Sequence, residues 1–256
     1  MVEVLNGGKL KKAKAGPTGP AFAFFHASVN FEHMETGKLS VVATPIGNLE
    51  DITFRAIRTL QEVDYILCED TRVTGKLLAH YEIKTPTKRY DAHASEKVHE
   101  DIINDLNSGK HIALVSDAGT PGVSDPGVLL ITQAREADIN IEAIPGPSAV
   151  TTAVSIAGLK GNQFSFLGFV PHKKGRQTFF ESLPAFDHPV IFFESTHRIM
   201  KTLDSLVEKN PDATVHIGRE LTKHFEEMLI GSPAEIKEIL EEETVKQKGE
   251  FVVIVS

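Results

Sequence analysis

The stretch ALVSDAGTPGVSDPG, Ala113–Gly127, decides how the rest of the chain is interpreted. Its apolar beginning, preceded by Ile112, predicts a buried strand. Three glycines, two prolines and two aspartates then follow within a few positions. A connection between a strand and a helix needs only about two to six residues. The excess of conformationally special residues therefore predicts that a ligand lies where this strand ends.

Strands and helices alternate on both sides of this stretch as far as residue 147. The apolar patterns predict strands at 39–44, 65–70, 111–117 and 139–147, and helices at 51–63, 71–81, 96–109 and 125–138. Strands that alternate with helices form parallel sheets covered by those helices. The first half of the chain is therefore predicted to be an α/β unit with a largely parallel sheet.

The pattern changes after Pro145, Gly146 and Pro147, which predict a stiff hinge followed by a helix of small residues. Further on, strands are predicted at 163–170, 188–195, 213–221, 224–232 and 250–256, and helices at 174–183, 196–210 and 232–243. Some of these strands follow each other directly, which favours antiparallel pairing. We predict an α/β protein of two α/β domains, 39–145 and 146–256. Residues 1–38, rich in Lys, Gly and Pro, are predicted to be an extension outside the fold.

The composition limits the class of protein. The chain has 256 residues, of which 41% are hydrophobic and 24% charged, with a net charge of −8. These values predict a soluble globular protein whose contacts with nucleic acid would need a local basic patch. The sequence contains no apolar run near the roughly 18–20 residues that cross a membrane. The presence of a single cysteine, Cys68, excludes a disulfide framework and a cysteine-rich zinc site, and favours a cytoplasmic protein. Cys68 itself is predicted to be a small buried apolar residue.

Three further predicted strands end in corners similar to the first one: TPIGNL at 44–49, PGPSA at 145–149 and FFESTHR at 192–198. In open α/β sheets, ligands bind beyond the carboxyl ends of the strands. None of the corners has the glycine pattern of a dinucleotide site or a P-loop. We expect Asp117 to Thr120 to contact the ligand. We expect Asp125, which precedes a proline, to be the N-cap of the next helix.

Several long motifs occur in order along the chain: LSVVATPIGNLEDITFRA, CEDTR, IALVSDAGTPGVSDPG, IPGPSA, FFESTHR, RELTK and KGEFVVIV. Together they resemble the cytidine 2′-O-methyltransferases of small-subunit ribosomal RNA, which share the fold of the tetrapyrrole (precorrin) methylases. The resemblance extends from about residue 38 to 256. It implies two α/β domains with S-adenosyl-L-methionine in the cleft between them. It also implies a homodimer that acts on 16S RNA or the 30S subunit, in the decoding region.

The resemblance also implies a set of cofactor-binding residues. They are Ile46, Asp117, Thr120, Ser148, Ala149, Phe193 and Leu221. The chain departs from the family at YDAHASE, which retains only His93 of a His-x-His-Asn-Glu run. Many members continue past the last strand with a helical tail. Because this sequence ends at Ser256, we expect RNA contacts that depend on such a tail to be absent or supplied elsewhere.

A ribose hydroxyl is a weak nucleophile, so a nearby general base would assist methyl transfer. The candidates for a catalytic role are Glu69, Asp70, His93, Glu194 and His197. Each of these side chains could instead be a helix cap or part of an ion pair, for example Asp70 with Arg72. No metal is expected to take part.

A basic stretch the size of HKKGR is usually only a solvated loop. Together with the resemblance to RNA methyltransferases, it indicates an RNA contact through Lys173, Lys174 and Arg176, with Lys223 and Arg198 as further candidates. Two other functions remain open from the sequence. A tetrapyrrole methylase would share the fold and cofactor, although its first corner is normally richer in glycine than TPIGNL. A non-catalytic module that binds adenosyl nucleotides would transfer no methyl group.

Overall fold

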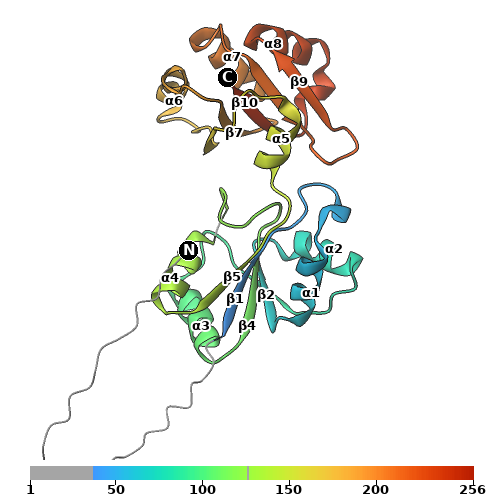
Figure 1. Cartoon of the computed structure of the whole chain (residues 1–256), viewed down its shortest axis with the longest axis vertical. Helices are drawn as coiled ribbons and strands as arrows, with labels where there is room; N and C mark the ends of the chain where they lie inside the picture. Colours follow the sequence, from blue (N-terminus) through green and yellow to red (C-terminus); the bar gives the residue numbers. More distant parts are fainter. Residues whose placement is uncertain (1–36, 126) are drawn as a thin grey trace, which may run out of the picture. The chain divides into compact units, whose positions relative to one another are not determined.

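The computed structural model describes residues 37–125 and 127–256, and its first half is built on a five-stranded sheet (Figure 1). The strands are β1 (Lys38–Val42), β2 (Tyr65–Cys68), β3 (Thr87–Arg89), β4 (His111–Val115) and β5 (Asn140–Ile144). Their order in the sheet is β3-β2-β4-β1-β5, and every pair is parallel. The predicted parallel α/β sheet is therefore confirmed.

Apolar side chains on the two faces of this sheet form two separate clusters. Ala113 and Val115 of β4 pack with α1 (Phe54–Glu62) and α2 (Thr71–His80). The alternate residues Ile112 and Leu114 pack with α3 (Glu96–Asn107) and α4 (Val128–Glu136). Because successive side chains of a strand point to opposite faces, helices cover the sheet on both sides. Cys68 is fully buried in the first cluster, as predicted.

Several elements begin later than the sequence pattern predicts. A 3-10 turn, Leu49–Asp51, precedes α1, whose N-cap is Thr53: its hydroxyl accepts a hydrogen bond from the N–H of Ala56. The prediction that Asp125 caps the following helix is wrong. That helix, α4, begins at Val128 and its N-cap is Gly127, which has a φ of 133° and provides no side-chain cap. Strand β3 was not predicted, because three residues carry no periodic signal.

The second half contains a mixed five-stranded sheet. Its strands are β6 (Ser165–Phe169), β7 (Val190–Ser195), β8 (Val215–Arg219), β9 (Glu227–Gly231) and β10 (Glu250–Val255), in the order β6-β7-β10-β8-β9. Only β6 and β7 are parallel within this sheet. The predicted antiparallel pairing in the second half is confirmed.

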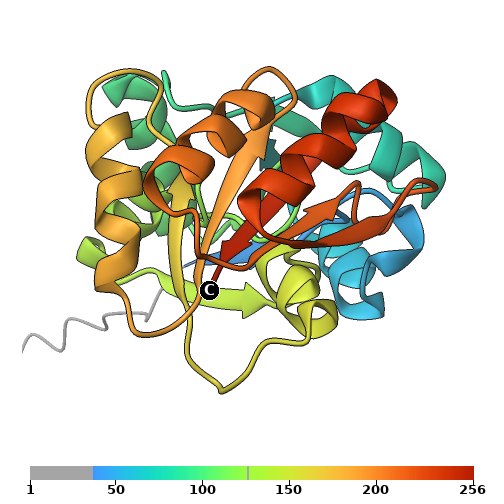
Figure 2. The same cartoon turned by 90° about the horizontal axis from the view of Figure 1, so that it is seen from above.

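Helices cover the second sheet on both faces as well. On one face, α6 (Arg176–Ser182), α7 (Ile199–Lys209) and α8 (Pro233–Glu242) pack on a core that includes Phe192 and Ile217, and α7 lies beside α8 (Figure 2). On the other face, α5 (Ala149–Ala157) packs against Ile191 and Ile254. Two more 3-10 turns lie at Leu183–Ala185 and Thr244–Gln247.

The strands of the first sheet lie within residues 38–144, and those of the second sheet lie within residues 165–255. The exact division into two domains at residue 145 stays a prediction. The predicted N-terminal extension falls almost entirely on residues outside the described part of the chain, although Lys38 already belongs to β1. Within the described ranges, no helix is long and apolar enough to cross a membrane.

Candidate active site

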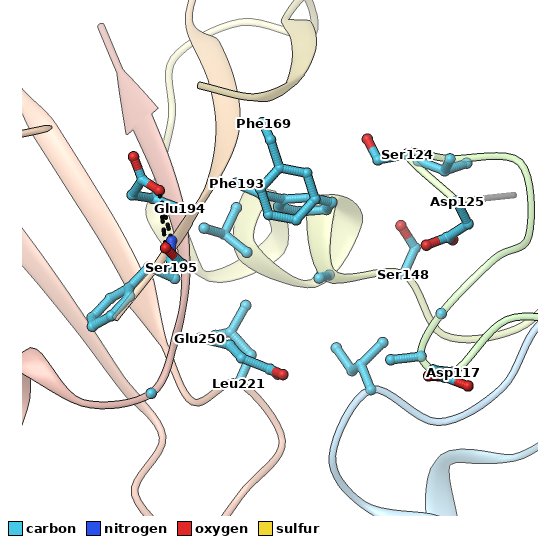
Figure 3. Close-up of a pocket in the computed structure, with 18 of the residues that line it drawn as sticks. Asp117, Ser124, Asp125, Ser148, Phe169, Phe193, Glu194, Ser195, Leu221 and Glu250 are labelled. Carbon is cyan, nitrogen blue, oxygen red and sulfur yellow. Dashed lines mark hydrogen bonds between the residues drawn. The ribbon is translucent and has the colours of Figure 1, made fainter. Parts of the chain in front are cut away.

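A cavity of about 490 Å³ lies among the loops that follow the strands of both sheets (Figure 3). Its lining comes from the corners after β1, β4, β5 and β8, from the end of β6, from β7 and its following loop, and from the beginning of β10. Both the volume and the mixture of apolar and polar groups are typical of a small-molecule site.

All the residues predicted to bind the cofactor line this one cavity. They are Ile46, Asp117, Thr120, Ser148, Ala149, Phe193 and Leu221. The four corners singled out in the sequence, far apart along the chain, therefore meet in space. Their direct contact with a cofactor stays a prediction.

Hydrogen bonds hold the corners after β1, β4 and β5 together. Thr44 and Gly119 exchange two backbone hydrogen bonds, and the Thr44 hydroxyl donates to the carbonyl oxygen of Ser116 at 3.1 Å. The Thr120 hydroxyl donates to the carbonyl oxygen of Pro147 at 3.2 Å. Gly119 has a φ of 85°, a conformation that costs an L-residue roughly 1–2 kcal/mol. The glycine therefore permits the turn that joins these loops.

The apolar part of the cavity wall comes mainly from four side chains. The Phe193 ring lies 5.3 Å from the Phe169 ring, edge to face, while Ile46 and Leu221 are almost fully buried. Aromatic and aliphatic surfaces of this kind suit the flat apolar face of a nucleobase. Leu221 lies between two residues with positive φ, Glu220 at 49° and Thr222 at 66°. Strained backbone of this kind is often found at functional sites.

Glu194, a predicted catalytic candidate, lines the cavity but has both carboxylate oxygens occupied. The Ser195 N–H donates to Oε1 at 2.7 Å, and the Thr202 hydroxyl donates to Oε2 at 2.6 Å. The Arg198 Nε lies 2.9 Å from Oε1, and the Arg176 Nη1 lies 3.6 Å from Oε2. Because Glu194 is buried and neutralised by two guanidinium groups, its surroundings favour a structural role over proton transfer.

The same network changes the interpretation of the basic stretch after β6. The Arg176 Nη2 donates to the Thr202 hydroxyl at 2.8 Å, and its guanidinium lies 5.1 Å from the centre of the Phe180 ring. The side chain of Arg176 therefore points inward, which is unfavourable for the predicted RNA contact. Lys173 and Lys174 are exposed.

The two further cationic candidates are also held by the protein. The Arg198 Nη1 donates to the carbonyl oxygen of Val170 at 2.8 Å. The Lys223 ammonium lies 2.9 Å from carboxylate oxygens of both Glu220 and Glu250. Neither side chain is therefore as available to a phosphate as the two exposed lysines.

Three of the catalytic candidates do not line the cavity. Asp70 is the N-cap of α2 and forms an ion pair with Arg72 at 2.6 Å, and these hydrogen bonds lower the pKa of Asp70. His93 lies in an exposed turn, where its N–H donates to the Asp91 carboxylate. Glu69 has a buried Oε1 with no hydrogen-bond partner. Burial, followed by the charges of neighbouring aspartates, raises the pKa of Glu69 to about 7.

Two further titratable residues, His197 and Asp125, line the cavity. His197, a predicted candidate, lines it and is exposed. Asp125, which the sequence pattern assigned to a helix cap, also lines it. Burial and the charge of Asp117 raise the pKa of Asp125 to about 6. The sequence signal that could have identified Asp125 is its position on the same long loop as Asp117, which was already predicted to contact the ligand.

The family model for tetrapyrrole (corrin/porphyrin) methylases matches residues 38–237. Curated relatives named ribosomal RNA small subunit methyltransferase I are similar over most of the chain. The protein from Thermotoga maritima is 44% identical over 86% of this chain and 98% of its own length. The protein from Halalkalibacterium halodurans is 46% identical over 86% of this chain and 76% of its own length.

The chain belongs to the ribosomal RNA small subunit methyltransferase I family. Solved structures show the fold this family shares with other methylases. A cobalt precorrin-4 methyltransferase of cobalamin biosynthesis has a TM-score of 0.65 at 16% identity, covering 85% of this chain and 94% of its own. A diphthine synthase has a TM-score of 0.66 at 14% identity, covering 86% and 89%. The predicted tetrapyrrole-methylase fold is confirmed.

As a member of this family, the protein is a methyltransferase that uses S-adenosylmethionine. The cavity fits this molecule chemically: apolar walls suit adenine, and carboxylates such as Asp117 suit ribose hydroxyls and a cationic amino acid moiety. A protein of similar fold, the uroporphyrin-III C-methyltransferase from Thermus thermophilus, has a crystal structure in complex with S-adenosylhomocysteine. Its TM-score is 0.58 at 16% identity, and the match covers 86% of this chain and 97% of that protein. Among the described residues, no cluster of His, Cys, Asp or Glu could hold a metal ion.

Proposed function

We propose that the protein methylates the 2′-hydroxyl of a cytidine ribose in the decoding region of small-subunit ribosomal RNA. The observation that carries the proposal is the convergence of all the predicted cofactor residues on one cavity, in a chain 44% identical to a ribosomal RNA small subunit methyltransferase I over nearly that protein's full length. The motifs TPIGNLEDIT and SDAGTPGVSDPG resemble those of the cytidine 2′-O-methyltransferases, and this resemblance supports the ribose 2′-hydroxyl as the acceptor.

S-adenosylmethionine supplies an electrophilic methyl group when it is bound in the cavity. We assign Ile46, Phe193 and Leu221 to the adenine, because their side chains form an apolar wall. We assign Asp117 to hydroxyl or amino groups of the same ligand, because its exposed carboxylate lines the cavity. By holding the donor in one orientation, these residues would convert a bimolecular reaction into a nearly unimolecular one.

The RNA is proposed to contact the exposed lysines after β6. Lys173 and Lys174 stand in the loop between β6 and α6, and Phe169 at the end of β6 lines the cavity. The contact would therefore lie close to the site of methyl transfer. Neither lysine forms a salt bridge within the described residues, so both ammonium groups can neutralise phosphates. We also propose that the enzyme is cytoplasmic and that it forms a homodimer. Sedimentation analysis of the purified protein tests the homodimer directly.

The decisive experiment offers the purified protein labelled S-adenosylmethionine and small subunits that lack the modification. The proposal expects one labelled cytidine, resistant to alkaline cleavage at its 3′ side because its 2′-hydroxyl is blocked. A tetrapyrrole acceptor serves as the control for the alternative function. Label in the tetrapyrrole only, or on a base rather than a ribose, would overturn the proposal.

A further inference from the structure

The cavity is lined by four carboxylates, which differ in what surrounds them. They are Asp117, Asp125, Glu194 and Glu250. A general base must have a carboxylate oxygen that is free to take a proton and must lie beside the reacting group. The four can therefore be compared by the partners that each one already has.

Three of the four are held by a cationic side chain or a backbone N–H. Glu194 is buried between two arginines, and both its oxygens accept hydrogen bonds. Glu250 is paired with Lys223 at 2.9 Å and has a mostly exposed side chain. The Oδ1 of Asp117 accepts a hydrogen bond from the backbone N–H of Asp70 at 3.2 Å.

Asp125 differs from the other three in that its one polar partner is a neutral hydroxyl, that of Ser116. Its carboxylate is half-buried and directed into the cavity (Figure 3). No Lys or Arg of the described residues forms a salt bridge with it, and it caps no helix. It lies eight positions after Asp117 on the same loop. That loop, residues 117–125, contains no Lys or Arg that could neutralise it.

We propose that Asp125 is the general base that accepts the proton of the ribose 2′-hydroxyl. The inference rests on the proposed function, because it presupposes a ribose acceptor. In the step, a bond forms between the ribose oxygen and the methyl carbon while the sulfur–carbon bond breaks and its electron pair passes to sulfur. The hydroxyl proton goes to the Asp125 carboxylate and afterwards to solvent.

The ionisation of Asp125 suits this role. Burial raises its pKa most, the charge of Asp117 adds to the effect, and a hydrogen bond from Ser116 opposes it, giving about 6. The charge of Asp125 in turn contributes to the raised pKa of Glu69. The other titratable groups that line the cavity are His197, Glu194 and Glu250. A base whose pKa lies just below the working pH is ionised and still takes up a proton readily.

The test is Asp125→Asn, which keeps the shape of the side chain and removes the base. We expect kcat to fall by about 10²- to 10⁴-fold, the usual contribution of a general base. The dissociation constants of S-adenosylmethionine and of the RNA should stay within about twofold, since one carboxylate oxygen remains as an amide acceptor. In the wild-type enzyme, kcat should rise with pH up to about pH 6 and then level off; this limb should vanish in the variant. Asp125→Glu should restore part of the activity.

Control variants separate this role from others. Asp101→Asn, at an exposed position of α3, should leave kcat unchanged. Weaker binding of S-adenosylmethionine by Asp125→Asn, with unchanged binding of S-adenosylhomocysteine, which lacks the sulfonium charge, would show that the carboxylate binds the sulfonium and would overturn the inference. Full activity in Asp125→Asn with loss in His197→Gln would transfer the role to His197. Wild-type methylation of a base instead of a ribose would overturn the proposed function, and the inference with it.

Discussion

Thr44 and Gly119 exchange two backbone hydrogen bonds, of 2.9 and 3.0 Å, across the corners that follow β1 and β4. This short antiparallel bridge joins two loops that are 75 residues apart in the sequence. Both loops contribute to the cavity wall, through Ile46 and through Asp117 to Thr120. The shape of the cofactor site therefore depends on the backbone at Gly119.

Gly119→Ala should lower the free energy of unfolding by about 1–2 kcal/mol, because φ of 85° is unfavourable for alanine. The new methyl group would make only ordinary contact with Cγ2 of Ile46, at 3.4 Å, but relief of the unfavourable φ would shift a loop that lines the cavity, so cofactor affinity should fall as well. Gly158→Ala is the matched control: its φ is 67° and no atom lies within 4 Å of the new methyl. The control should lose similar stability in denaturant titrations while calorimetry shows unchanged cofactor affinity. Equal affinity in both variants would contradict this account.

Asp117→Ala should weaken S-adenosylmethionine binding by roughly one to two orders of magnitude. A hydrogen bond that involves a charged group contributes about 1.5–3 kcal/mol, and 1.4 kcal/mol corresponds to a factor of ten. Isothermal titration calorimetry measures the change directly. An unchanged affinity would remove Asp117 from the cofactor site.

Glu194→Gln should lower the free energy of unfolding by about 3–5 kcal/mol, because two buried guanidinium groups would lose their counter-charge. Thr202→Val, which removes one hydrogen bond to Glu194 and one from Arg176 but leaves the ion pairs, should cost about 2 kcal/mol. Urea titrations compare the two variants. A stable Glu194→Gln protein with greatly reduced kcat would instead support Glu194 as a catalytic residue.

Changing Lys173 and Lys174 together to Glu should weaken RNA binding and reduce its salt dependence. Each lost phosphate contact lowers the slope of log K against log salt by about 0.7–0.9. Cofactor affinity should not change. Lys76 and Lys97, exposed on α2 and α3, provide a control with the same change of charge, which should leave the salt slope intact. If both double variants lose RNA affinity equally, the effect is general electrostatics rather than a contact at this loop.

Glu69 should make the protein less stable as the pH rises from about 4.5 to 7. Its pKa is raised from 4.5 to about 7 in the folded protein, so the folded state holds the proton more tightly than the unfolded state. The unfolded state therefore carries fewer protons in this window, and stability is lost as pH rises through the folded pKa. Glu69→Gln should raise the melting temperature at pH 8 relative to wild type, and less so at pH 4.5. Parallel melting curves across this range would argue against a raised pKa.

Much of the cofactor site follows from the sequence because each corner comes directly after a recognisable strand. TPIGNL and PGPSA carry Pro and Gly at fixed places after apolar runs, and parallel strands bring their carboxyl ends to one edge of the sheet. The local pattern and the predicted sheet therefore identified these corners, whereas the individual cofactor residues within them were implied by the family resemblance.

The remaining assignments depended on tertiary contacts that no local pattern contains. Arg176 belongs to a run of basic residues, yet the turn at Gly175, with φ of 87°, places it at the start of α6, where it reaches Glu194. Asp125 precedes a proline, as helix caps often do, but the helix begins only at Val128. Which carboxylate is neutralised and which is free was decided by residues from other strands and helices.

The single cysteine has a practical consequence. Cys68 is fully buried in the core of the first sheet, and burial raises the pKa of its thiol, so little reactive thiolate is available. A cysteine introduced at His172, an exposed position beside the two lysines of the loop, would be far more reactive than Cys68. A maleimide fluorophore could be attached there without replacing Cys68, and the fluorescence anisotropy of that conjugate would report RNA docking at the loop in real time.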